Sequence, residues 1–172
     1  MKKRLFLIGL AMLLAFAAFA EETEVDKSVG LKDSDVKNFI KNYKQLYKDA
    51  ENFSAYLATP TGAMNQAVAT AALAGTAEKT LINIMNKNGI SGANAFEKFT
   101  RINFYTVIAA YDVTMEKTIA ENPALAAYMA AASIDPYAEM RKKLNAADFA
   151  IIKANINELM RVMELNGNNN DE

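Results

Sequence analysis

The sequence contains no histidine and no cysteine. Without histidine, it lacks both the side chain that most often transfers protons near neutral pH and the commonest metal ligand. Without cysteine, it has no thiolate nucleophile and no zinc–thiolate site. The H-E-x-x-H, glycine-rich phosphate-binding and G-x-S-x-G motifs are also absent. These absences argue against most common hydrolases, redox enzymes and metalloenzymes, so we expect no catalytic residue, no cofactor and no bound metal.

Catalysis that uses only carboxylates, or a serine with a lysine, is compatible with this composition. Glu116 with Glu121, or Asp112 with Glu116, could place two carboxylates on one helix. Charged residues at such spacings more often form a solvated helix face. An enzyme is therefore the least favoured of the three functions considered below.

The first 20 residues have the organisation of a secretory signal peptide. A basic start, Met1 to Arg4, precedes an apolar stretch from Leu5 to Phe16, and Ala18-Phe19-Ala20 forms a small-residue cleavage site. The apolar stretch is shorter than the roughly 20 residues that span a bilayer, so we predict cleavage after Ala20 rather than an uncleaved anchor. The expected location is the bacterial periplasm or the exterior.

The absence of cysteine also bears on the exported form. A lipoprotein needs a cysteine at its cleavage site, and an exported protein without cysteine forms no disulfide. Removing residues 1–20 takes Lys and Arg from 19 to 16 against 20 Asp and Glu, a net charge of 16 − 20 = −4. Nucleic acid is a poor partner for an acidic chain. No later segment resembles a membrane span, so we expect no membrane span after cleavage.

The periodicity after residue 32 predicts helices and no strand. Residues 21–32 are expected to be a flexible acidic leader. A first helix over residues 34–58 is predicted, with Asp33 as its N-cap and Asp35 in its first turn. Its apolar residues alternate at spacings of three and four: Val36, Phe39, Tyr43, Leu46, Ala50, Phe53 and Leu57. Its lysines lie outside this stripe, at positions 37, 41, 44 and 48. A solvated face or a contact with an acidic partner or anionic surface would explain them.

The segment from Ala63 to Asn88 is alanine-rich and predicts a second helix, with Gly75 as a position that could bend or split it. Residues 59–62 should end the first helix, and Asn88-Gly89 should end the second with Gly89 in the left-handed conformation. Asn94 and Glu97 then have the spacing of a capping box for the next helix.

Residues 95–121 predict the central helix of the fold. Its first turns are amphipathic, with Phe96, Phe99 and Ile102 inward and Glu97, Lys98 and Arg101 outward. From Ile102 to Met115 the apolar residues occupy most sides of the helix, which is typical of a helix buried on most sides. We therefore expect the other helices to pack around this one.

The remaining chain predicts three further helices. The first begins at Asn122-Pro123, with its buried side formed by Leu125, Tyr128, Met129 and Ala132. A short helix follows Asp135-Pro136. The last helix starts after Asn145, with Asp148 three residues on, and Asn166-Gly167 ends it before a disordered tail. Its apolar stripe is Phe149, Ile152, Ile156, Leu159 and Met163.

The starts of the first and last helices resemble each other. Leu31-x-x-x-Asp35-Val36 matches Leu144-x-x-x-Asp148-Phe149, and the stripes that follow have the same spacing. A duplicated unit would explain this, but two ordinary solutions to starting a bundle helix are the favoured explanation.

Asp112 is the polar position with the clearest functional interest, because it falls on the helix expected to be most buried. It could be an acid in a ligand pocket, or a surface residue paired with Lys or Arg. The candidate pocket residues are Phe99, Tyr105, Tyr111, Asp112, Met115 and Tyr128. Aromatic and methionine residues at helical spacing are, however, more often plain core.

The sequence thus predicts an all-α fold, an irregular bundle of five to six helices in one domain over residues 33–166, with residues 167–172 as the tail. The leading functional hypothesis is a non-enzymatic interaction or accessory protein that binds another periplasmic or envelope protein. The alternative is a carrier of a small apolar ligand in the bundle core.

Overall fold

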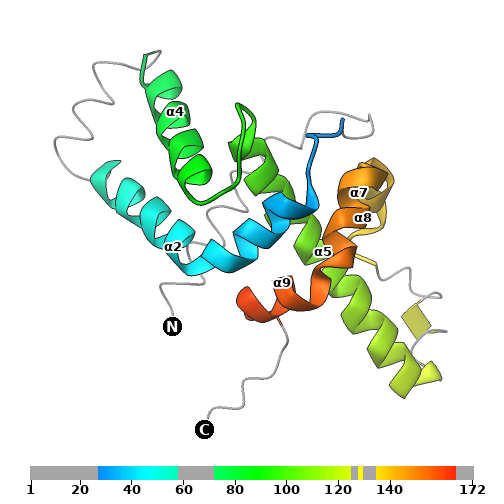
Figure 1. Cartoon of the computed structure of the whole chain (residues 1–172). Helices are drawn as coiled ribbons and strands as arrows, with labels where there is room; N and C mark the ends of the chain where they lie inside the picture. The colour runs from blue at the N-terminus through cyan, green and yellow to red at the C-terminus, as the bar shows by residue number, and fades with distance from the viewer. Residues whose placement is uncertain (1–26, 58–71, 125–127, 130–134, 166–172) are drawn as a thin grey trace, which may run out of the picture. The chain divides into compact units, whose positions relative to one another are not determined.

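The computed structural model describes residues 27–57, 72–124, 128–129 and 135–165 (Figure 1). Six regular elements lie in these residues; all are α-helices, and the described part of the chain contains no strand. The predicted all-α class is confirmed. The chain divides into two compact units, Val29–Phe99 and a second unit that combines Met1–Ser28 with Thr100–Glu172. The predicted signal peptide, the stop at residues 59–62 and the C-terminal tail lie outside the described residues.

The unit Val29–Phe99 contains α2 (Asp33–Leu57), α4 (Ala72–Lys87) and the first residues of α5 (Ala95–Glu121). α2 and α4 pack against each other. Val36, Phe39 and Leu46 of the predicted α2 stripe have no exposed surface. α4 continues through Gly75 without a break. The expected helix start near Ala63 lies outside the described residues.

The N-terminus of α2 is capped by a different residue from the one predicted. Asp33 is the first helical residue, not the N-cap. Lys32 takes the cap position, because its carbonyl accepts the N–H groups of Asp35 (2.9 Å) and Val36 (3.3 Å). The Lys32 N–H donates in turn to the Asp35 carboxylate at 3.1 Å, so Asp35 supplies the side-chain half of a capping box. Lys32 has no short side chain that can accept a hydrogen bond, so the sequence does not identify it as a cap residue.

The segment just before α2 belongs to the predicted leader of residues 21–32. Val29 and Leu31 are buried in the described part of residues 21–32. The Val29 carbonyl accepts a hydrogen bond from the Asn94 side chain at 2.6 Å. Two apolar side chains among polar neighbours do not form a periodic stripe, so the sequence pattern did not reveal this anchoring.

Gly89 ends α4 as predicted, with a φ of +87°. The Gly89 N–H donates to the Asn86 carbonyl and the Ile90 N–H donates to the Met85 carbonyl, both at 3.0 Å. These two bonds form a Schellman motif, which satisfies carbonyls that the helix end leaves unpaired. Ile90 and Met85 are both buried, so the turn also contributes to the core of this unit.

Replacing Gly89 by alanine is expected to destabilise the protein. The left-handed backbone alone costs a residue with a Cβ roughly 1–2 kcal/mol, and the new Cβ would lie 2.9–3.0 Å from three atoms of the Asn38 side chain. Gly30→Ala is the matched control, because Gly30 has a φ of +64° and nothing within 4 Å of the added Cβ. Urea denaturation should show a larger loss for Gly89→Ala; equal losses would contradict the predicted clash.

The second unit contains most of α5 and three short helices, α7 (Ala138–Lys143), α8 (Ala146–Ala154) and α9 (Ile156–Val162). The prediction of one continuous last helix is wrong. At Asn155 the backbone N–H donates to the Ile152 carbonyl at 3.0 Å, while the side-chain amide occupies the Ile151 carbonyl at 2.9 Å. An asparagine side chain that competes for a backbone carbonyl favours such a break.

The buried apolar stripe continues across the break at Asn155. Four of the five residues predicted for the inner side of the last helix are buried, and Phe149 is half-buried: Ile152, Ile156, Leu159 and Met163. Met160, which the stripe does not include, is buried as well. α9 ends at Val162, and Glu164 takes the left-handed conformation with a φ of +57°. The helix therefore ends before the predicted Asn166-Gly167 stop, which lies outside the described residues.

α5 begins and ends where the sequence predicted, but its burial is uneven. Ile102, Tyr105 and Ile108 have no exposed surface. From Tyr111 to Glu121 every residue is half-buried or exposed, including Met115. The expected burial as far as Met115 is therefore wrong. Periodicity indicates which sides of a helix are apolar, not where the neighbouring elements end, and Figure 1 shows the end of α5 extending beyond α8 and α9.

Candidate functional site

The candidate pocket residues differ widely in exposure. Phe99 and Tyr105 are buried, Tyr111, Asp112 and Met115 are half-buried, and Tyr128 is 63% exposed. Phe99 belongs to the unit Val29–Phe99, and the others belong to the second unit. The prediction that Tyr128 lies on a buried side is wrong; its hydroxyl makes a tyrosine tolerable at the surface, which an apolar stripe does not reveal. Leu125 and Ala132 lie outside the described residues.

Phe99 and Tyr105 belong to separate aromatic clusters. The Phe99 ring lies 6.1 Å from the Phe39 ring and 6.0 Å from the Tyr47 ring. The Tyr105 ring meets Phe149 edge-on at 5.6 Å. These contacts are those of core packing within each unit.

Tyr111 and Asp112 do come together, around Arg141 of α7. The Arg141 Nε and Nη2 atoms donate to one oxygen of Asp112, at 3.0 and 2.5 Å, and Nη1 pairs with Asp135. The guanidinium lies 5.8 Å from the centre of the Tyr111 ring, which in turn meets Tyr137 edge-on at 5.1 Å. Of the two interpretations of Asp112, the structure bears out pairing with a basic residue.

The charges of this Arg141 cluster stabilise one another. Hydrogen bonding to Arg141 holds the pKa of the Asp135 carboxyl below its ordinary value. Hydrogen bonds from Arg141, first to Asp112 and then to Asp135, raise the pKa of the guanidinium. The Asp135 carboxylate is therefore a poor proton donor near neutral pH. The ion pair between Arg141 and Asp112 joins α7 to α5.

The Asp135 contact should weaken in acid. Because the folded-state pKa lies below the ordinary aspartate value of about 3.9, Asp135 contributes stability above that pH and loses it as the pH falls through the lower folded-state pKa. Asp135→Asn should therefore be less stable than the natural protein at pH 7. The difference should shrink as the pH falls below about 4. Thermal denaturation across this range measures it, and a difference that grows in acid would contradict the assignment.

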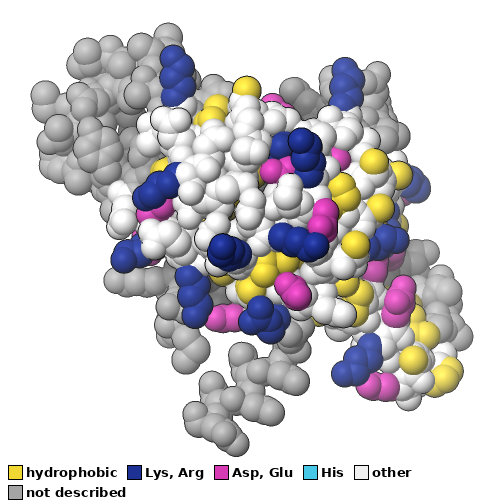
Figure 2. Space-filling model, viewed as in Figure 1, with side chains coloured by type: hydrophobic (Ala, Val, Ile, Leu, Met, Phe, Trp, Pro, Cys, Tyr) yellow, Lys and Arg dark blue, Asp and Glu magenta, His cyan; other side chains and the backbone are white. Residues whose placement is uncertain are grey.

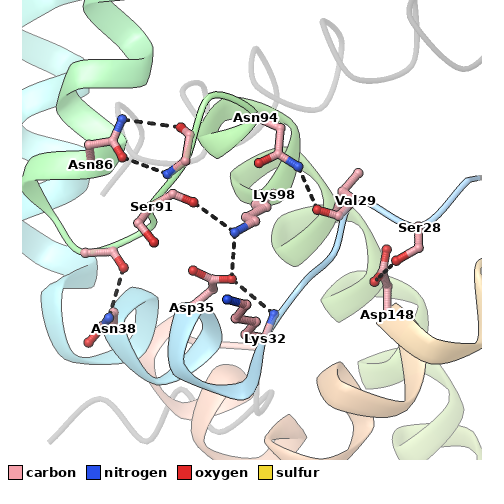
Figure 3. A network of polar contacts seen from close by, with 12 residues as sticks. Ser28, Val29, Lys32, Asp35, Asn38, Asn86, Ser91, Asn94, Lys98 and Asp148 are labelled. Atoms are coloured by element: carbon pink, nitrogen blue, oxygen red, sulfur yellow. Dashed lines mark hydrogen bonds and ion pairs between the residues drawn. The ribbon is translucent and has the colours of Figure 1, made fainter.

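A second polar cluster lies at the start of α5 and corrects the sequence prediction. Lys98 was expected to point outward, but its side chain is only 8% exposed. Its Nζ pairs with Asp35 Oδ2 at 3.0 Å and donates to the Ser91 carbonyl at 2.8 Å (Figure 3). Asp35 is buried because this cation and the Lys32 N–H stabilise its charge together.

The same cluster fastens the turn between α4 and α5. The side chains of Asn38 and Asn42, on α2, donate to the carbonyls of Gly89 (2.9 Å) and Asn88 (2.8 Å). The Asn86 side chain accepts the Gly92 N–H at 2.9 Å (Figure 3). Asparagine suits this role because its amide both donates and accepts. These residues sit on the polar side of the predicted stripes, and their spacing alone did not identify their partners.

A third cluster, in the second unit, includes the other residue wrongly predicted to point outward. Arg101 is 7% exposed, and its Nη1 donates to the Tyr105 hydroxyl oxygen at 2.6 Å. The same oxygen accepts the Asn145 N–H at 2.7 Å, and Arg101 Nη2 donates to the Lys27 carbonyl at 3.3 Å. The guanidinium also lies 5.0 Å from the centre of the Tyr105 ring, which lets an arginine be buried at low cost.

The sequence resemblance between the two helix starts has a physical counterpart. Asp35 and Asp148 are both at the third helical position, and they are 2% and 1% exposed. Asp148 donates its N–H to the Asn145 side chain at 3.1 Å, and its carboxylate accepts the Ser28 hydroxyl at 2.9 Å. Each unit therefore buries an aspartate at the third helical position whose carboxylate binds a residue outside its own helix.

Other candidate chemistry is not assembled in the described residues. Glu116 and Glu121 are exposed, and Glu121 lies 4.0 Å from Lys117. No group of three or more acidic residues is placed to hold a metal ion within the described ranges. No described helix is both long and apolar enough to cross a bilayer.

No protein-family model matches the sequence, and no curated protein or solved structure is significantly similar to it.

Proposed function

We propose that this chain is an exported, non-enzymatic helical protein that acts by binding another protein of the bacterial cell envelope. Its helices would form one irregular bundle organised around α5, and residues 1–20 would be removed on export. The signal-peptide pattern supports the location, and the absence of histidine and cysteine supports a role without catalysis.

The observation that supports a binding role is the second half of α5. Val113, Met115 and Ile119 are half-buried, whereas the core residues earlier in the same helix are buried. A helix that continues beyond its neighbours with apolar side chains on several sides presents a surface that a partner can cover. The buried polar clusters, by contrast, are used internally: within the described residues, no buried side-chain nitrogen or oxygen atom is left without a hydrogen-bond partner.

Site-specific photo-crosslinking in a bacterial host that exports the protein tests the binding role. A crosslinker at Ile119 should form an adduct with one defined envelope protein, and the adduct should be lost when Met115 is replaced by glutamate. A crosslinker at Glu158, an exposed position on α9, is the control and should not form that adduct. Equal labelling from both positions, or none from Ile119, would contradict the proposal.

Mass spectrometry of the protein purified gently from its compartment tests export and separates the alternative. A measured mass that matches a chain beginning at Glu21 would support cleavage after Ala20. A mass that still includes residues 1–20 would contradict it. A small apolar molecule that remains bound to the intact protein would favour the carrier function over protein binding.

A further inference from the structure

The lysines of α2 form one straight line along the helix. With 3.6 residues per turn, Lys37, Lys41, Lys44 and Lys48 fall within about 60° of one another around the axis and span roughly 16 Å along it. All four are exposed. The opposite side of the helix carries the fully buried residues Val36, Phe39 and Leu46. Packing of the apolar side therefore fixes the lysine line on the outer surface of this unit.

This lysine line concentrates positive charge on an acidic protein. Lys37 pairs with Asp33 at 2.7 Å, and Glu51 is exposed beyond the other end of the line. Within the part of the chain that the structure describes, Lys41, Lys44 and Lys48 form no ion pair. Figure 2 shows several basic side chains gathered over α2. The middle of the line is thus its most basic part.

We propose that the lysine line of α2 docks the protein on an anionic phospholipid surface. Lysine ammonium groups are compact, hydrated charges on flexible stems, and they attract headgroup phosphates without the fixed geometry that arginine requires. The line contains no aromatic side chain and no arginine, the residues that dominate protein–protein binding energy. A straight row of charges on a convex helix fits a flat charged surface better than a shaped protein pocket.

The attraction should be moderate and sensitive to salt. A basic residue near an anionic membrane strengthens binding by roughly fivefold, so losing two should weaken it roughly 25-fold. Salt screens such exposed charges, because the Debye length falls from about 30 Å at 0.01 M to about 3 Å at 1 M. The inference relies on the proposed export only for access to an envelope membrane. The binding test uses purified protein, so its result is independent of where the chain is processed.

Co-sedimentation with vesicles tests the inference. The natural protein should bind vesicles of phosphatidylglycerol and phosphatidylcholine at low salt, and it should not bind vesicles of phosphatidylcholine alone. Lys41→Gln/Lys44→Gln should weaken that binding roughly 25-fold. Lys117→Gln/Lys142→Gln is the matched control, because it removes the same charge from exposed positions on other helices and should bind like the natural protein. Far-UV circular dichroism checks that both variants remain helical.

Three results would overturn the inference. The first is no binding to the anionic vesicles, and the second is an equal loss in both double variants, which would indicate net charge rather than the lysine line. The third is binding of soluble polyglutamate, lost only in Lys41→Gln/Lys44→Gln, without vesicle binding. That pattern would assign the line to an acidic protein partner.

Discussion

Replacing Lys98 by methionine is expected to destabilise the protein by roughly 3–5 kcal/mol. The substitution leaves the buried Asp35 carboxylate with the Lys32 N–H, 3.1 Å away, but without its cation. It also removes the donor that the Ser91 carbonyl accepts at 2.8 Å. An uncompensated charge in a site that excludes water costs far more than the ion pair itself contributes. The loss should appear as a lower urea midpoint in equilibrium unfolding.

A neighbouring ion pair provides the control for Lys98→Met. Lys87 lies 3.2 Å from Asp49, but its side chain is 70% exposed, so Lys87→Met should cost less than about 1 kcal/mol. Asp35→Asn/Lys98→Met should recover part of the loss, because the double variant buries no unpaired charge. If Lys98→Met lowers the free energy of unfolding no more than Lys87→Met does, the Lys98–Asp35 ion pair is not buried in solution.

Tyr105→Phe is expected to cost roughly 2–4 kcal/mol although it removes a single oxygen atom. That oxygen accepts hydrogen bonds from Arg101 Nη1 at 2.6 Å and from the Asn145 N–H at 2.7 Å. Tyr105 has no exposed surface, so water cannot replace the lost acceptor. The Arg101 bond is charge-assisted and should account for the larger share.

Two measurements distinguish this role from simple packing. Hydrogen exchange of the Asn145 amide should speed up in Tyr105→Phe, because that amide loses its acceptor. Tyr137→Phe keeps the edge-on contact with Tyr111 and should cost less than about 1 kcal/mol, since Tyr137 is only half-buried. Unchanged stability and unchanged Asn145 exchange in Tyr105→Phe would contradict the assigned hydrogen bonds.

The sequence predicted the elements better than it predicted their ends and polar partners. Spacings of three and four identified the buried side of α2 and the stripe that runs through α8 and α9. Asn88-Gly89 correctly marked the end of α4, because only a left-handed residue closes that turn without strain. The predicted N-cap of α2 was wrong by one residue, because Lys32 caps with its backbone rather than with its side chain.

The candidate site was harder to predict for a similar reason. The sequence indicates that Asp112 needs a partner, but its neighbours along α5 do not indicate that Arg141 provides one. The sequence predicts Lys98 and Arg101 at the surface, because charged side chains rarely lie inside without compensation. Their compensation comes from Asp35 and Tyr105, which no local pattern links to them in advance.

By itself, the sequence determined the helical class, the apolar sides of the helices, the lysine line on α2 and the absence of imidazole and thiol chemistry. Each of these follows from local composition and from the fixed 3.6-residue period of the helix. Only the tertiary structure decided that Lys98 and Arg101 are buried and that the end of α5 is left partly uncovered. A charge is buried, and an apolar side is covered, only when a residue or element distant in the sequence folds against it, and such distant contacts are not encoded in any short stretch of the chain.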